Sequence, residues 1–251
     1  MRTSSSDFCH TPTINAQSVA AVTRDQMREV DRLMIEEYGI SLLQMMENAG
    51  RNLAELAGRL LGGLSGRRIC FVAGSGNNGG GALAGARHAS NRGAIVDVVL
   101  ASDSSRLGVV PALQLASLEA MGIAPRNAGE KLPQADMYVD GIIGYSLRGN
   151  VTGDARELVT SLNAHPGVVL SLDVPTGLDV DTGVTAGDVV RAFATMTLAL
   201  PKPGLLTPAA APFVGELYLA DISVPPGLYA RLGLDVPALF SADALLHLQA
   251  V

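Results

Sequence analysis

The chain has 251 residues, of which 48% are hydrophobic, with 28 glycines, 13 prolines and no tryptophan. This length suits one large α/β domain or two small ones and allows a substantial core. The net charge of -6 and the pI of about 5.2 argue against a nucleic-acid surface, which needs clustered lysine and arginine, and no run approaches the ~18 apolar residues of a membrane span.

The N-terminal segment and the cysteines bear on cellular location. Residues 1–22 are predicted to be a disordered leader, because their first part is rich in serine and threonine and lacks the apolar core of a secretory signal. Cys9 and Cys70 are too far apart to indicate a disulfide framework or a zinc site, so a cytoplasmic location is expected. With no internal repeat or low-complexity linker, residues 23–251 are expected to form a single domain.

Two helices are predicted ahead of any strand. The first opens at Thr23, which has Gln26 as a capping-box partner, and stops at Gly39. Its apolar residues at helical spacing are Met27, Val30, Leu33 and Met34. The second runs from Ser41 to about Leu61, and its inner face is predicted to hold Leu42, Met45, Met46, Ala49, Leu53 and Leu56. These two apolar helices also offer a surface for a second subunit, so a homodimer is one expectation.

From Arg68 onward, short apolar runs alternate with helical segments. The predicted strands are Ile69–Ala73, Ile95–Leu100, Met137–Asp140, Val168–Asp173, Thr195–Ala199 and Leu217–Ala220. The predicted helices between them are Gly80–Asn91, Pro111–Met121 and Asp154–Ala164. This alternation indicates an α/β fold: a Rossmann-like three-layer α/β/α sandwich with a mostly parallel sheet, preceded by the two N-terminal helices.

A glycine-rich loop, Gly74–Gly80, follows the first predicted strand. Its glycines allow close approach of a ligand, and the helix that follows offers unpaired N–H groups to an anion. Glycine spacing alone is equally typical of a tight strand-to-helix turn, but the paired Asn77 and Asn78 favour a polar ligand or a cation bound through oxygen. No charged side chain occurs between Phe71 and Ala86, a gap that the motif alone does not explain.

Two other predicted strands end in aspartate. Asp140 is followed by a glycine-punctuated loop that contains Arg148, and Asp173 is followed by a turn that contains Thr176. Because the carboxyl ends of parallel strands share one edge, Asn78, Asp140 and Thr176 are expected to converge there. Such an oxygen-only set suits a monovalent cation or a water cluster, while a turn-capping Asp140 and a solvated Arg148 are the structural alternative.

Asp173 is expected near the same crevice, where burial could raise its pKa into a range useful for acid–base work. Lys202 could reach an anionic ligand or be a solvated turn residue. Asp179 and Asp181 are predicted to stabilise a turn. The four histidines, His10, His88, His165 and His247, lack metal-ligand spacing. A serine hydrolase is disfavoured because no Gly-x-Ser-x-Gly motif is present.

Taken in order, four segments resemble the NAD(P)H-hydrate epimerase family, also called the YjeF N-terminal domain family. They are Ser41–Gly50 (SLLQMMENAG), Gly74–Gly80 (GSGNNGG), Val139–Asp140 and Asp173–Gly177 (DVPTG). The resemblance covers about Thr23 to Pro226. It implies a nicotinamide nucleotide repair enzyme that interconverts the R and S forms of hydrated NADH and NADPH, so that a separate dehydratase specific for one epimer can restore the cofactor.

The resemblance also implies roles for individual residues. Asp173 would bind substrate and be the catalytic carboxylate, and a potassium ion would be held by Asn78, Asp140 and Thr176, with Thr176 in place of a common serine. The other substrate-binding positions would be Asn77, Asn78, Gly79, Gly80 and Gly81 near the phosphates, and the loop residues Gly144, Tyr145, Ser146, Leu147, Arg148, Gly149 and Asn150.

One position departs from the family pattern. The motif usually continues Gly-Gly-Asp-Gly, whereas this chain has Gly79-Gly80-Gly81-Ala82. The change is neutral if Asp173 alone carries the chemistry. Two alternatives stay open: a catalytically altered paralogue that binds a nucleotide-like ligand as a scaffold, and an isomerase or lyase acting on another substrate. With the sequence ending at Val251, the fused dehydratase domain that some family members carry is not expected here.

Overall fold

Two helices precede the main strands, and both begin at capping boxes. In the computed structural model, which describes residues 11–249, α1 (Arg24–Glu36) follows Thr23 and α2 (Leu42–Leu61) follows Ser41. Each cap hydroxyl accepts a hydrogen bond from a glutamine N–H three residues later, and that glutamine side chain accepts the cap residue's own N–H. The pair of N-terminal helices predicted from the sequence is confirmed.

The strands form a single sheet with one antiparallel pair. They are β1 (Thr13–Asn15), β2 (Arg68–Ala73), β3 (Ile95–Leu100), β4 (Arg126–Asn127), β5 (Met137–Gly141), β6 (Val168–Leu172), β7 (Ala194–Leu198), β8 (Glu216–Ala220) and β9 (Leu245–Gln249). Within the described residues their order is β1-β9-β8-β7-β6-β5-β2-β3-β4, and neighbours are parallel except β8 and β9. The predicted mostly parallel α/β sheet is therefore confirmed.

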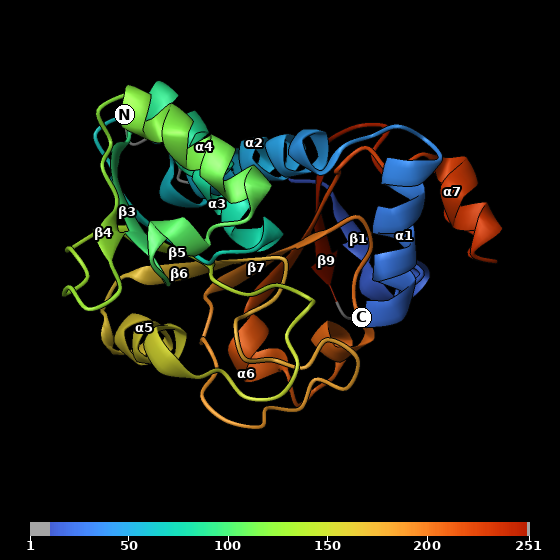
Figure 1. Ribbon diagram of the computed structural model, residues 1–251. Helices are drawn as coiled ribbons and strands as arrows, with labels where there is room; N and C mark the ends of the chain where they lie inside the picture. The colour runs from blue at the N-terminus through green and yellow to red at the C-terminus, as the bar shows by residue number, and fades with distance from the viewer. Residues whose placement is uncertain (1–10, 250–251) are drawn as a thin grey trace, which may run out of the picture.

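Helices cover both faces of the sheet, as Figure 1 shows: α2, α3 and α4 lie on one face, and α5 and α6 on the other. The remaining helices are α3 (Asn77–Asn91), α4 (Val109–Ala120), α5 (Gly153–Ala164), α6 (Ala211–Val214) and α7 (Pro226–Arg231), with 3-10 turns at Ala16–Ser18, Ser104–Arg106 and Pro203–Leu206. Helix α3 begins at Asn77 rather than at the predicted Gly80. The glycine loop is thus shorter than expected, and Asn77 to Gly80 form the first helical turn.

Three strands were not predicted from the sequence. Strand β1 lies inside the segment that was expected to be a disordered leader, and it pairs with β9 at the edge of the sheet. Val19 and Val22 are also buried, so residues 11–22 are part of the fold, while residues 1–10, including Cys9 and His10, lie outside the described residues. Strand β4 has only two residues, too few to produce an apolar pattern.

The order of the strands determines where a ligand can bind. From β2 the chain passes to β3 on one side, and β5 then pairs with β2 on the other side. This reversal is a topological switch point, where open α/β sheets hold ligands outside the carboxyl ends of the strands. None of the helices within residues 11–249 is long and apolar enough to cross a membrane.

Candidate functional site

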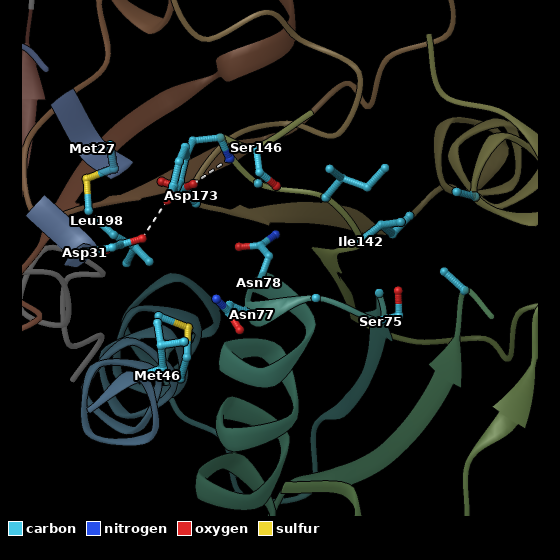
Figure 2. Close-up of a pocket in the computed structure, with 18 of the residues that line it drawn as sticks. Met27, Asp31, Met46, Ser75, Asn77, Asn78, Ile142, Ser146, Asp173 and Leu198 are labelled. Atoms are coloured by element: carbon cyan, nitrogen blue, oxygen red, sulfur yellow. Dashed lines mark hydrogen bonds between the residues drawn. The ribbon is translucent and has the colours of Figure 1, made fainter. Parts of the chain in front are cut away.

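A cavity of about 360 Å³ opens at the carboxyl ends of the central strands (Figure 2). Part of its wall is apolar, formed by Met27 and Leu42 from α1 and α2, Met46, Ile142 and Leu198. The polar side chains of the lining are Asp31, Ser75, Asn77, Asn78, Ser102, Tyr145, Ser146 and Asp173. A largely apolar wall with a few converging polar groups is typical of small-molecule sites.

One end of the cavity is the N-terminus of α3. Its N-cap residue is Gly76, which has no side chain to accept the first N–H groups of the helix, so these are free for an anionic ligand. Glycine is required at position 79, because a Cβ there would lie 1.9 Å from the carbonyl oxygen of Gly74. Nearby, Ser102 Oγ is buried without a hydrogen-bond partner among the described residues, so it is available to a ligand.

Packing explains why the helical part of the stretch between Phe71 and Ala86 carries no charge. Every residue from Gly79 to Ala86 is buried, because α3 lies against the sheet and between α2 and α4. A Cβ at Gly81 would meet Leu172 Cδ2 at 3.0 Å and Met46 Sδ at 3.4 Å. Gly79, Gly80 and Gly81 do not line the cavity, although Met46, the neighbour of Gly81, does. Position 81 is thus an apolar contact beneath the site.

Asp140 is the centre of a fully buried network. Its carboxylate accepts hydrogen bonds from Thr176 Oγ1 (2.7 Å), Thr176 N (2.9 Å), Ser171 Oγ (2.9 Å) and Ile142 N (3.3 Å). Burial raises the pKa of Asp140, and these hydrogen bonds oppose the rise. No cationic side chain pairs with Asp140 within residues 11–249, so its ionised form is stabilised only by neutral donors.

Asn78 is separate from that network. Its Nδ2 donates to the backbone oxygen of Leu172 (3.2 Å), and a Cβ at Gly144 would lie 3.1 Å from Asn78 Oδ1. Asn78 lines the cavity, whereas Asp140 and Thr176 lie behind its wall. Across the described chain, no three His, Cys, Asp or Glu side chains gather in a way that would hold a metal ion.

Asp173 follows β6 directly and has a positive φ of 67°, a conformation that is rare outside glycine but is several-fold enriched in aspartate and asparagine. Its Oδ1 accepts a hydrogen bond from Lys202 Nζ at 2.6 Å, and its Oδ2 accepts one from Tyr145 N at 2.9 Å. Lys202 is fully buried and also donates to Thr197 Oγ1 and Leu198 O, so it is not a solvated turn residue. The sequence left both readings of Lys202 open, and the structure assigns it to Asp173.

A second carboxyl group, Asp31 on α1, lines the same cavity and was not predicted. Its Oδ2 accepts a 2.6 Å hydrogen bond from Tyr145 Oη. Desolvation raises the pKa of Asp31 to about 6, while the hydrogen bond from Tyr145 acts in the opposite direction. A signal was present in the sequence: Asp31 lies four residues after Met27 and three before Met34, on the buried stripe of the helix.

Only part of the predicted substrate loop reaches the cavity. Gly144, Tyr145 and Ser146 line it. The next four residues, Leu147, Arg148, Gly149 and Asn150, are not part of its wall, and Arg148 is exposed. Asp179 accepts hydrogen bonds from Thr182 within its turn, as predicted, and also pairs with Arg24 at 2.6 Å.

Comparison with known proteins gives a consistent picture. The family model described as "YjeF-related protein N-terminus" matches residues 42–204. The NAD(P)H-hydrate epimerase of Dehalogenimonas lykanthroporepellens is 44% identical over 229 residues, covering 88% of this chain and 89% of that protein. The enzyme of the same name from Rhodopirellula baltica is 35% identical, covering 81% and 84%.

Longer relatives and a crystal structure extend the comparison. The bifunctional NAD(P)H-hydrate repair enzyme Nnr of Salinibacter ruber is 36% identical; the match covers 84% of this chain and 42% of that protein. The crystal structure of the yeast protein YNL200c matches with a TM-score of 0.75 at 25% identity, covering 92% of this chain and all of that one. With the family model matched over most of the chain and these identities over nearly its whole length, the chain belongs to the family of YjeF-related protein N-terminal domains.

Proposed function

We propose that this protein interconverts the R and S epimers of hydrated NADH and NADPH, as part of nicotinamide nucleotide repair. The observation that carries the proposal is the cavity at the switch point, which has the free N–H groups of α3 at one end and buried carboxyl groups at the other. The relatives named NAD(P)H-hydrate epimerase support the same activity. The dehydratase that would consume one epimer is a functional partner, as the bifunctional relatives indicate.

The arrangement accounts for both parts of the substrate. The phosphates would bind at the N-terminus of α3 near Asn77 and Asn78, where backbone N–H groups and the helix dipole favour negative charge. The hydrated nicotinamide ring would then lie towards Asp173 and the apolar wall. Loss of the ring hydroxyl, assisted by the nitrogen lone pair, gives a planar cation, and the carboxylate of Asp173 would stabilise its charge.

Epimer exchange follows from that planar intermediate, because water can return to either face of the ring. The site has to hold the cation and keep a proton donor within reach of the departing oxygen. Gly81, in place of the family aspartate, is compatible with this chemistry, since Asp173 is held independently by Lys202 and Tyr145.

A potassium ion is the second part of the proposal. The site would use oxygen atoms of Asn78, Asp140 and Thr176, and the donor set fits a monovalent cation because it contains one carboxylate and no nitrogen or sulfur ligand. A buried Asp140 without a cationic partner in the described chain supports this assignment. When bound, the ion would supply the positive charge that balances Asp140.

The test is a chiral assay of epimer exchange, starting from one purified epimer. The wild-type protein is expected to exchange the epimers faster than the spontaneous rate, and Asp173→Asn to lower kcat at least 100-fold. Asparagine is chosen because it tolerates the positive φ at this position. Asp154→Asn, an exposed position in the first turn of α5, is the matched control and should behave as wild type. No exchange above the spontaneous rate by wild type would disprove the proposal.

A further inference from the structure

Tyr145 joins the two carboxyl groups of the cavity. Its backbone N–H donates to Asp173 Oδ2 at 2.9 Å, and its hydroxyl donates to Asp31 Oδ2 at 2.6 Å. Arg24 Nε in turn donates to the backbone oxygen of Tyr145 at 3.1 Å. Tyr145 therefore sets the spacing between Asp31 and Asp173. The hydrogen bonds from Arg24 and to Asp31 also connect α1 to the loop that contains Tyr145.

The two carboxyl groups differ in what surrounds them. Both oxygens of Asp173 accept hydrogen bonds, one of them from the ammonium group of Lys202. Asp31 has one oxygen engaged by Tyr145, whereas its Oδ1 accepts no hydrogen bond within the described part of the chain. Figure 2 shows Asp31, Asp173 and Asn78 pointing towards the same space, and Asp31 is part of the cavity wall.

Burial of Asp31 favours its protonated form. Desolvation is the largest effect and raises the pKa of Asp31 to about 6, and the negative Asp173 acts in the same direction. Lys202 and the Tyr145 hydroxyl oppose the rise. Arg28, on the same helix, acts on Tyr145. A carboxyl with a pKa near 6 suits general acid catalysis close to neutral pH.

We propose that Asp31 is the general acid and base of the epimerisation, and that Asp173, held by the ammonium group of Lys202, acts beside it as the carboxylate that stabilises the cationic ring. The inference rests on the proposed function. It assigns proton transfer to Asp31, whose carboxyl has a free oxygen, and charge stabilisation to Asp173, whose carboxyl is bound by the ammonium group of Lys202. Tyr145 is a positioning residue that fixes the distance between the two.

The reaction balances without any additional reactant. The carbon–oxygen bond of the hydrate breaks, its electron pair stays on the oxygen, and the oxygen takes the proton of Asp31 and leaves as water. The ring nitrogen lone pair forms a C=N bond, which leaves a cation beside the carboxylate of Asp173. Water then adds to either face of that carbon, the C=N pair returns to nitrogen, and Asp31 accepts the released proton. Nothing is oxidised or reduced.

The experiment measures kcat and KM for epimer exchange between pH 5 and pH 9, with the spontaneous rate subtracted. Wild-type kcat is expected to fall as pH rises and Asp31 ionises. Asp31→Asn should lower kcat at least 100-fold with KM within about threefold of wild type. The proposal would be overturned if Asp31→Asn had a kcat within threefold of wild type, or if it raised KM and left kcat unchanged.

Two further variants separate catalysis from structure. Tyr145→Phe keeps the backbone N–H to Asp173 but removes the hydroxyl that stabilises the Asp31 carboxylate, so the fall in kcat should move to higher pH. An unmoved profile would contradict the role given to Asp31. Asp25→Asn, on the same helix and paired with Arg28 at the surface, should keep wild-type kcat and profile.

The outcomes also distinguish this inference from the proposed function. Wild type without exchange would overturn both. Wild type with exchange, Asp173→Asn inactive and Asp31→Asn active would overturn only the role of Asp31. The melting temperature of Asp31→Asn should be no lower than that of wild type, so that a loss of kcat is not a loss of fold.

Discussion

Asp140 and Asp173 lie at the ends of two neighbouring strands, and both are buried, yet their charges are stabilised in different ways. Asp140 is surrounded by hydroxyl and backbone donors from Ser171, Thr176 and Ile142. Asp173 has a buried ammonium group at 2.6 Å. The first arrangement gives the carboxyl no cationic side chain within residues 11–249, and the second places an ammonium group directly beside it.

The difference shows what each group can do. The network of Asp140 ties the loop after β5 to the turn after β6, so it shapes the floor of the site, and its uncompensated charge favours a bound cation. Asp173 borders the cavity and has its own cationic partner in Lys202, so it is suited to contact the substrate. Two substitutions test this contrast directly: one removes Lys202, the charge partner of Asp173, and the other removes the charge of Asp140 itself.

The largest effect is expected for Lys202→Met, which keeps the length of the side chain and removes the ammonium group. Asp173 would then be a buried charge without a cationic partner, a situation that costs about 3–5 kcal/mol. Urea unfolding at pH 7 measures the loss. The double variant Lys202→Met/Asp173→Asn removes both charges and should recover much of the stability. A loss below about 1 kcal/mol in the single variant would show that the pair is not essential to the fold.

A smaller effect is expected for Asp140→Asn. The amide retains one acceptor oxygen, but its NH₂ group must face at least one of the donors that now point at the carboxylate. The hydroxyls of Ser171 and Thr176 can rotate, whereas the N–H of Thr176 cannot, so the expected cost is about 2 kcal/mol in urea unfolding.

The same variant tests the cation proposal through thermal unfolding in potassium chloride and in choline chloride at equal ionic strength. Wild type is expected to melt at a higher temperature in potassium, because an ion that binds only the folded state stabilises it. Asp140→Asn should lose that difference. Equal melting temperatures of the wild-type protein in the two salts would contradict a potassium site.

Much of the site could be predicted because it lies at strand ends. Asp140 and Asp173 each close an apolar run, and Asn77 and Asn78 follow another. In a parallel sheet such positions share one edge, so they lie close together where the strands are neighbours, as β2, β5 and β6 are. The N-terminal helices were predicted from apolar residues at helical spacing, and the core strands from short, nearly continuous apolar runs, which are typical of strands buried on both faces.

The partners of Asp31 and Lys202 could not be predicted from the sequence pattern. Each is a charged residue whose neighbours in sequence do not reveal its partner: Lys202 meets Asp173 twenty-nine positions away, and Asp31 meets Tyr145 across 114 positions. Strands β1 and β9 were missed because they pair with each other across almost the whole chain. The buried Lys202–Asp173 pair and the pairing of β1 with β9 depend on tertiary contacts, which local patterns do not contain.

The smallest effect, and the one with the opposite sign, is expected for the stability of Asp31→Asn. The pKa of Asp31 is raised from 3.8 to about 6 in the folded protein, so the folded state binds more protons than the unfolded state between these values, and stability falls as pH rises through that window. The full shift corresponds to ~3 kcal/mol, and partial exposure of the carboxyl reduces this to about 1–2 kcal/mol.

Asparagine does not titrate, so the variant should be more stable than wild type at pH 7 and should lose that advantage near pH 4. Urea unfolding at the two pH values, with the exposed Asp25→Asn as control, measures the difference. If the variant were less stable than wild type at pH 7, Asp31 would contribute to the stability of the fold. If the variant were more stable but lost epimer exchange, Asp31 would be a residue that destabilises the folded protein and is needed for catalysis.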